Sequence, residues 1–204
     1  MLKSRWLTSE RDLIDFRQNF EERSGNPLST DYMLAAKVRG FFDQRGELIA
    51  GFIINATQPL RYFDWLPEGD REWRHGDAFR AEDFVEITCI WTKKGRIAAI
   101  SLSRAQIYLE SLIFALNTGK PAILGGTFIE KVRDQQMRVM HQPYRAVVTN
   151  LRGKECPYWL YYVPRHQALS LMVQNIALEA LVFPTQRLTR HFAALLRNSL
   201  ARSN

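Results

Sequence analysis

The stretch FVEITCIWTKKGRIAAISLSRAQ, residues 84–106, predicts a strand, a basic turn and the start of a helix in direct succession. β-Branched and aromatic residues favour a strand over 84–91. One acidic residue, Glu86, lies inside this apolar run. Because an ionised carboxylate is costly to bury, Glu86 must be paired, face a wet cleft or lie on the solvent side of the strand.

The two faces of this strand differ in composition, because successive side chains point to opposite sides. One face is mixed, with Phe84, Glu86, Thr88 and Ile90, and the other is wholly apolar, with Val85, Ile87, Cys89 and Trp91. A half-exposed strand explains this alternation without any function. The mixed face is also where a general base fits, because partial burial raises the pKa of a glutamate toward the operating pH. Cys89, on the apolar face, is not expected to be a nucleophile.

A basic turn joins the strand to the helix. Lys93, Lys94 and Arg96 lead into small and apolar residues, after which helical spacing runs from Ser101 to Thr118. The free N–H groups and the positive dipole end of a helix N-terminus favour anions, and flanking cations neutralise phosphate charge. The turn is therefore a candidate pyrophosphate site. Many strand-to-helix turns share this pattern of cations, so the pattern alone is weakly specific.

Hydrophobic periodicity predicts the remaining elements on both sides of this stretch. A helix over 10–23 and a hairpin of strands 34–42 and 47–55 come before it. A strand, a short helix, two strands and two final helices follow, over 122–129, 130–140, 144–150, 158–163, 166–181 and 185–199. The sequence predicts one α/β domain over 1–164 with a helical extension over 165–204 packed on the same domain.

The connection over 56–83 is too long for a hairpin turn and too aromatic for a flexible linker. Its aromatic residues include Tyr62, Phe63, Trp65, Trp73 and Phe79. Two interpretations stand side by side. The connection forms an ordered lid or pocket wall, or it is a surface excursion whose aromatic rings pack on the core.

Charge and composition restrict the partners. The chain has 204 residues, a net charge of +7 and a pI near 9.6, which favours an anionic partner such as nucleic acid, a membrane surface, a phosphate-bearing cofactor or an acidic carrier protein. The start of the chain lacks the pattern of a secretory signal, and no apolar run is long enough to span a membrane, so we expect a cytoplasmic protein. Scattered histidines and two distant cysteines predict neither a metal site nor a disulfide.

The order of elements and the stretch FVEITCIWTKKGRIAAIS resemble the fourth strand and cofactor loop of the GNAT superfamily of acyl-CoA-dependent N-acyltransferases. The family motif Arg/Gln-x-x-Gly-x-Gly/Ala falls on residues 96–101, where Ala99 and Ser101 occupy the two glycine positions. Their side chains narrow the approach of a pyrophosphate to the backbone. The resemblance covers residues 3–163 and implies a mixed, mostly antiparallel sheet flanked by helices, with the two C-terminal helices as an addition.

The resemblance also implies roles for individual residues. Glu86 matches the position where several members carry the base that deprotonates the amine. The backbone of Ile90, Trp91 and Thr92 would line the acyl-pantetheine arm where the fourth and fifth strands separate. The turn and helix start would hold the rest of the donor, through Arg96, Ala98, Ala99, Ile100, Ser101 and Arg104. Tyr144 is the nearest match to the tyrosine that protonates the leaving thiolate, and three others compete with it, namely Tyr158, Tyr161 and Tyr162.

Within the superfamily, the layout is similar to acyl-homoserine-lactone synthases and long-chain N-acyl amino acid synthases, through GELIAGFIIN, VEITCIW and GTFIEKVRDQQMRVM. The acidic cluster that holds the amino donor of the lactone synthases has no counterpart between Ser24 and Val38, so a lactone product is not expected. The resemblance implies transfer of an acyl group from acyl-CoA, acetyl-CoA or the phosphopantetheine of an acyl carrier protein to the amine of a small molecule. The positive net charge suits an acidic carrier protein.

A second function class rests on the C-terminal pattern over 186–197. Arg187, Arg190 and Arg197 face away from the apolar residues of this pattern. Such a helix packs on its own domain or on a twin subunit in a homodimer, or it lies on nucleic acid or an anionic membrane. The alternative to the enzyme is therefore a non-catalytic module of the same fold that binds nucleic acid or a protein through this helix.

Overall fold

The described residues form a seven-stranded sheet with the strand order β1-β2-β3-β4-β5-β7-β6. The computed structural model describes residues 2–66, 79–96, 102–137, 140–149 and 155–174. All neighbouring strands are antiparallel except β4 and β5, which are parallel. This confirms the mixed, mostly antiparallel sheet that the resemblance implies. The strands are β1 (Lys3–Trp6), β2 (Lys37–Phe42), β3 (Leu48–Asn55), β4 (Phe84–Thr92), β5 (Ala122–Thr127), β6 (His141–Thr149) and β7 (Glu155–Pro164).

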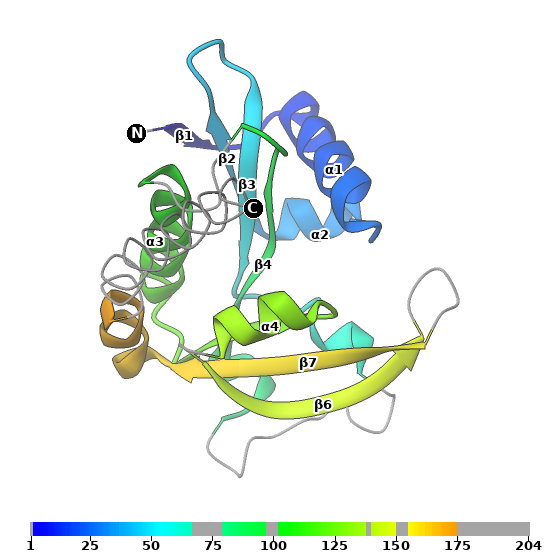
Figure 1. Ribbon diagram of the computed structural model, residues 1–204, viewed down its shortest axis with the longest axis vertical. Helices are drawn as coiled ribbons and strands as arrows, with labels where there is room; N and C mark the ends of the chain where they lie inside the picture. Colours follow the sequence, from blue (N-terminus) through cyan, green and yellow to red (C-terminus); the bar gives the residue numbers. More distant parts are fainter. Residues whose placement is uncertain (1, 67–78, 97–101, 138–139, 150–154, 175–204) are drawn as a thin grey trace, which may run out of the picture.

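Helices cover both faces of the sheet (Figure 1). They are α1 (Glu10–Ser24), α2 (Thr30–Ala35), α3 (Leu102–Leu116) and α4 (Glu130–Gln136). Residues 165–174 are also helical, where the first helix of the predicted extension begins, whereas the predicted helix over 185–199 lies outside the described residues. Two elements, β1 and α2, were not predicted, because both are short and carry little periodic apolar pattern.

Helix α1 shows why these predictions succeed. The Ser9 side chain accepts a hydrogen bond from the Asp12 N–H at the N-terminus, and Gly25 ends the helix with φ of 69°. Leu13, Phe16 and Phe20 form its buried stripe. This stripe packs with α2 on one face of the sheet, in a core that includes Leu13, Phe16, Phe20, Met33, Val38, Ile53, Cys89 and Trp91.

Helix α3 covers the opposite face. Its residues Ile107, Leu112 and Ala115 pack in a core with Phe52 of β3 and Ile123 of β5. This core therefore spans both halves of the sheet. The part of the β3–β4 connection that the structure describes packs in a third core, beside β5 and β7, through Leu60, Phe63 and Leu66 against Phe84, Leu124, Tyr158 and Tyr162.

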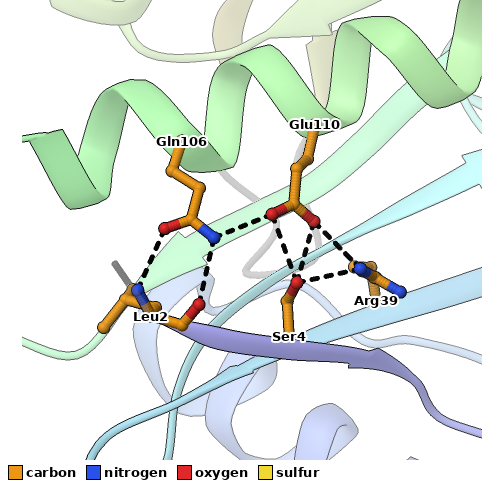
Figure 2. Close-up of polar contacts among 5 residues, drawn as sticks. All are labelled: Leu2, Ser4, Arg39, Gln106 and Glu110. Atoms are coloured by element: carbon orange, nitrogen blue, oxygen red, sulfur yellow. Dashed lines mark hydrogen bonds and ion pairs between the residues drawn. The ribbon is translucent and has the colours of Figure 1, made fainter.

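A polar network joins α3 to the first two strands, and Figure 2 shows its five residues. Glu110 of α3 accepts hydrogen bonds from Ser4 (2.9 Å) and Arg39 (3.1 Å). Gln106 exchanges hydrogen bonds with the main chain of Leu2 and donates to Glu110. The guanidinium of Arg39 also lies 5.0 Å from the ring centres of both Trp6 and Phe114. The edge strand β1 is thus tied to a helix more than 100 positions away in the sequence.

The described residues include no helix that is both long and apolar enough to cross a bilayer.

Replacing Glu110→Gln should lower the free energy of unfolding by about 1–3 kcal/mol, because it leaves the charge of Arg39 without its partner. The Arg39 side chain is only 15% exposed, so water replaces the lost partner poorly. Chemical denaturation measures the change. The matched control is Glu22→Gln, since Glu22 pairs with Arg23 at 3.6 Å with its side chain 79% exposed. The control should lose less than about 0.5 kcal/mol; equal losses for the two variants would contradict this account of the network.

Candidate functional site

The candidate site lies where β4 and β5 separate. These strands pair at three positions, Phe84 with Ala122, Val85 with Ile123 and Glu86 with Leu124. β4 then continues to Thr92 and β5 to Thr127 with no further pairing between them among the described residues. In Figure 1, β2 to β4 accordingly run across the direction of β6 and β7. A parallel pair that opens in this way exposes main-chain groups along one edge of each strand.

Glu86 occupies the last paired position of β4 and is fully buried, with 0% exposure. Its carboxylate accepts hydrogen bonds from the Tyr32 hydroxyl, from Asn55 Nδ2 (3.2 Å) and from the N–H groups of Arg61 (2.9 Å) and Tyr62 (3.1 Å). The expectation that Glu86 lies on a partly wet face is therefore wrong. It is a buried acidic residue whose partners are all donors.

Burial raises the pKa of Glu86 above its usual value, and the hydrogen bonds from Tyr32, Arg61, Tyr62 and Asn55 offset part of this rise. The desolvation of an ionised carboxylate disfavours the charged form, whereas donors that point at it favour the charged form. Ionised Glu86 can satisfy every one of these donors at once. A proton on Oε1 would be placed against one of its three donors, Tyr32, Asn55 and Arg61.

The partners of Glu86 come from three separate elements. Tyr32 belongs to α2, and Asn55, the last residue of β3, pairs directly with Glu86 across the sheet. Asn55 also organises the start of the next connection, because its Oδ1 accepts hydrogen bonds from the N–H and the hydroxyl of Thr57. The chain then turns back so that the N–H groups at 61 and 62 point at Glu86. The aromatic connection is thus anchored at the start of the opening between the strands.

Tyr62 lies where the two strands begin to separate. Its hydroxyl donates to the Ile87 carbonyl at 3.0 Å, and its own carbonyl accepts from the Tyr158 hydroxyl at 2.7 Å. Its ring lies against the backbone of β5, where a Cβ on Gly126 would come within 2.8 Å of Tyr62 Cδ1. The first described part of the connection, residues 56–66, therefore packs on the core and lies beside the end of the β4–β5 pairing. The interpretation of the connection as a lid or pocket wall stays a prediction.

The alternation of β4 changes at Cys89, which has a positive φ of 52° beside a register shift against β3. Such a bulge inserts a residue and reverses which side chains face which side. Cys89 and Trp91 accordingly pack on the α1 side, while Ile87 and Ile90 pack on the α3 side. The predicted faces of this strand are wrong beyond Thr88 for that reason. Burial raises the pKa of the Cys89 thiol to about 11, so at neutral pH it is no thiolate nucleophile.

Three of the residues predicted to line the donor lie on β4 beyond the last β4–β5 pair. Trp91 and Thr92 pair with Gly51 and Ala50 on the β3 side, so their β5 side is the one that opens. Ile90 is partly buried against the core beneath α3. The Trp91 ring packs on Phe16 at 5.8 Å, on the other face. The main chain of these residues therefore lies along the opening, and their role in holding a donor stays a prediction.

The basic turn is held by an acidic residue that the sequence did not single out. Glu47 forms ion pairs with Lys93 and, at 2.8 Å, with Arg96. These two side chains remain 35% and 44% exposed, so an anion can still reach them. Ala98, Ala99, Ile100 and Ser101 lie outside the described residues. Arg104 belongs to the first turn of α3, and its side chain is likewise not described.

Tyr144 lies on β6, opposite Leu160 of β7, and only its main chain is described. β6 is three strands from β4, which corresponds to about 14 Å at the usual strand spacing. Tyr158, Tyr161 and Tyr162 are buried in β7, and the Tyr158 hydroxyl is already bonded to the carbonyl of Tyr62. Tyr62 lies at the end of the β4–β5 pairing, where its hydroxyl donates to the Ile87 carbonyl, and in the sequence it stands out only as one of several aromatic residues.

Metal-ligating residues do not gather at this site. Over the described part of the chain, no three histidine, cysteine, aspartate or glutamate side chains lie close enough together to hold a metal ion. Cys89 and Cys156 are both free thiols.

Comparisons with known proteins bear on the fold. No protein-family model and no curated protein matches the sequence. Among solved structures, FeeM, an N-acyl amino acid synthase from uncultured soil microbes, matches with a TM-score of 0.64 and 13% identity, over 84% of this chain and 94% of that chain. An acetyltransferase from Bacillus subtilis, solved with CoA, matches with a TM-score of 0.52 and 16% identity, over 80% and 99%.

A third structure, the ribosomal-protein-S18-alanine N-acetyltransferase from Escherichia coli, matches with a TM-score of 0.54 and 11% identity, over 80% of this chain and 94% of that chain. Identities this low establish the fold alone. The chain therefore has a GNAT-like fold.

Proposed function

We propose that the protein is an N-acyltransferase that moves an acyl group from the thioester of acyl-CoA or an acyl carrier protein to the amine of a small molecule. The observation that carries the proposal is the opening between β4 and β5, with a buried carboxylate and a tyrosine hydroxyl where the strands begin to separate. The unpaired edge of β4 offers main-chain groups to the amides of a pantetheine arm. Neighbours of the same fold include an N-acyl amino acid synthase and acetyltransferases solved with CoA or acetyl-CoA.

The residues that would hold the donor follow from this geometry. The arm would run along the main chain of Ile90, Trp91 and Thr92, and its phosphates would meet the turn that carries Lys93 and Arg96. Glu47 at present neutralises both cations, so phosphate binding requires them to turn away from it. The remainder of the donor site would be formed by Ala98, Ala99, Ile100, Ser101 and Arg104. Tyr144 is a candidate for the acid that protonates the leaving thiolate.

Glu86 is the proposed base. Its raised pKa brings it closer to the operating pH. Oε1 accepts from Tyr32, Asn55 and Arg61, whereas among the described residues Oε2 accepts from Tyr62 alone and keeps a lone pair for an incoming amine. Asn55, Arg61 and Tyr62 are fixed by the sheet and by the main chain. Tyr32, by contrast, reaches Glu86 from the short helix α2 with one side chain. Rotation of the Tyr32 side chain would uncover Oε1 for an amine, or for a water that relays its proton.

Donor binding is tested by thermal denaturation with a panel of CoA, acetyl-CoA, a long-chain acyl-CoA and acylated carrier protein. At about 100 times its Kd, a true donor should raise the Tm by roughly 5–10 °C. ADP, which has phosphates but no pantetheine arm, is the control and should have a smaller effect. No shift across the panel would remove the donor-binding proposal. Salt-dependent binding of duplex DNA without any thioester response would instead favour the non-catalytic module with the basic segment 186–197.

Replacing Glu86→Gln should lower kcat by about 10²–10⁴-fold, because the base is lost. It should also lower the free energy of unfolding by about 1–3 kcal/mol, because an amide N–H₂ group would face donors. Thiol release from acetyl-CoA with a panel of amino acids and polyamines measures the rate. Glu82→Gln, on an exposed residue of the same connection, is the control. A Glu86→Gln variant with the parent rate would exclude Glu86 as the base.

The same assay over a range of pH checks the ionisation of this residue. A base works only when ionised, and burial raises the pKa of Glu86. The value of kcat/KM should therefore fall as the pH is lowered through a pKa above about 4.3, the usual value for glutamate. A profile that stays flat down to that usual value would contradict the assignment.

Replacing Glu47→Gln should tighten CoA binding, by up to about fivefold at low salt, because it releases Lys93 and Arg96 for the phosphates. The gain should shrink as salt screens the charges. Isothermal titration calorimetry gives the affinities. Glu22→Gln makes the same change in net charge at an exposed position on α1 and should leave the Kd unchanged. Weaker binding by the Glu47 variant would show that this pair helps the site rather than masking it.

A further inference from the structure

Tyr62 closes the narrow end of the opening between β4 and β5. The last paired residues are Glu86 and Leu124, and the next carbonyl on β4, that of Ile87, accepts a hydrogen bond from the Tyr62 hydroxyl at 3.0 Å. On the β5 side, the Gly126 N–H is close enough to the phenol oxygen to lower its pKa, as is the hydroxyl of Thr88. One phenol oxygen therefore reaches polar groups of both strands just where their own pairing stops.

The surroundings of Tyr62 fix this position from three sides. Its N–H is bonded to Glu86, its carbonyl is bonded to Tyr158, and its ring rests on the bare backbone of Gly126. A side chain at position 126 would overlap the ring, since its Cβ would lie 2.8 Å from Tyr62 Cδ1. Such placement by neighbours, without any bound molecule, is what a preorganised hydrogen-bond donor requires.

We infer that the Tyr62 hydroxyl is the hydrogen-bond donor to the sulfur of the acyl donor, a role that rests on the proposed acyl transfer. An arm that enters at the open end, beside Trp91 and Thr92, and runs along β4 brings its terminal thioester to the narrow end. There the Tyr62 hydroxyl needs only to rotate its O–H from the Ile87 carbonyl to the sulfur. The ring does not have to move.

The reaction balances without a net change at Tyr62. The amine nitrogen forms a bond to the thioester carbon, the carbon–sulfur bond breaks, and its electron pair goes to sulfur. The proton lost by the amine ends on sulfur and gives the free thiol and the amide. Tyr62 keeps its own proton and stabilises the charge on sulfur through the hydrogen bond.

The acidity of the group supports a hydrogen-bond donor rather than an acid that gives up its proton. Burial raises the pKa of the Tyr62 phenol above its usual value, and the contacts with Thr88 and Gly126 offset only part of that rise. An ordinary thiol has a pKa of about 8.5, below even an unperturbed tyrosine at about 10. Transfer of the phenol proton to the thiolate would therefore be thermodynamically unfavourable. A hydrogen bond from the phenol to the thiolate requires no such transfer.

The test compares CoA with desulfo-CoA, in which hydrogen replaces the thiol group, for the natural chain and for Tyr62→Phe. The natural chain should bind CoA about 2–10-fold more tightly than desulfo-CoA, the range expected for one net hydrogen bond. Tyr62→Phe should bind the two equally. Ser111→Ala is the control, because it also loses one buried hydroxyl, which donates to the Tyr108 carbonyl on α3, and should keep the preference for CoA.

Each outcome has one meaning. If the natural chain binds neither compound, the proposed function fails and the role of Tyr62 fails with it. If it binds both equally, or if Tyr62→Phe keeps the preference, donor binding stands and the role of Tyr62 is overturned. Should Tyr62→Phe not fold, 3-fluorotyrosine at position 62 of the otherwise natural chain gives the second measurement. Its fluorine resonance should move on addition of CoA and not of desulfo-CoA, and equal responses would overturn the inference.

Discussion

The buried carboxylate of Glu86 is the interaction on which the site depends. Its four donors belong to α2, the end of β3 and the β3–β4 connection. Without an acceptor at this point, the N–H groups of Arg61 and Tyr62 would be buried without partners, at a cost of about 1–3 kcal/mol each. The same two hydrogen bonds bring Tyr62 to the end of the β4–β5 pairing. One acidic residue in a strand thus sets the shape of the opening beside it.

Much of the fold could be predicted from local patterns in the sequence. Helices α1 and α3 have complete apolar stripes, and β3 and β4 are runs of apolar and β-branched residues. Local patterns failed where an element is short or owes its position to distant contacts. The edge strand β1 has only four residues and alternates partly buried with exposed side chains, and α2 has a single buried residue, Met33.

The candidate site was predictable only in outline. Glu86 could be identified as an acidic residue in an apolar strand. Its burial could not be predicted, because its hydrogen-bond partners lie 24 to 54 positions away in the sequence. The positive φ at Cys89 reverses the alternation of β4, and no glycine marks that position. Glu47 pairs with cations 46 and 49 positions further along, which local charge patterns do not reveal. The surroundings of the site residues thus depend on long-range contacts. Contacts of this kind are the feature that is hardest to predict from a single sequence.

The close contact between the Tyr62 ring and the backbone of Gly126 links two positions on different segments of the chain. A larger residue at 126 would meet both Tyr62 Cδ1 at 2.8 Å and the Tyr158 hydroxyl at 2.9 Å, so it fits only if both tyrosines give way. Homologues of this chain that keep tyrosine at 62 are therefore expected to keep glycine at 126.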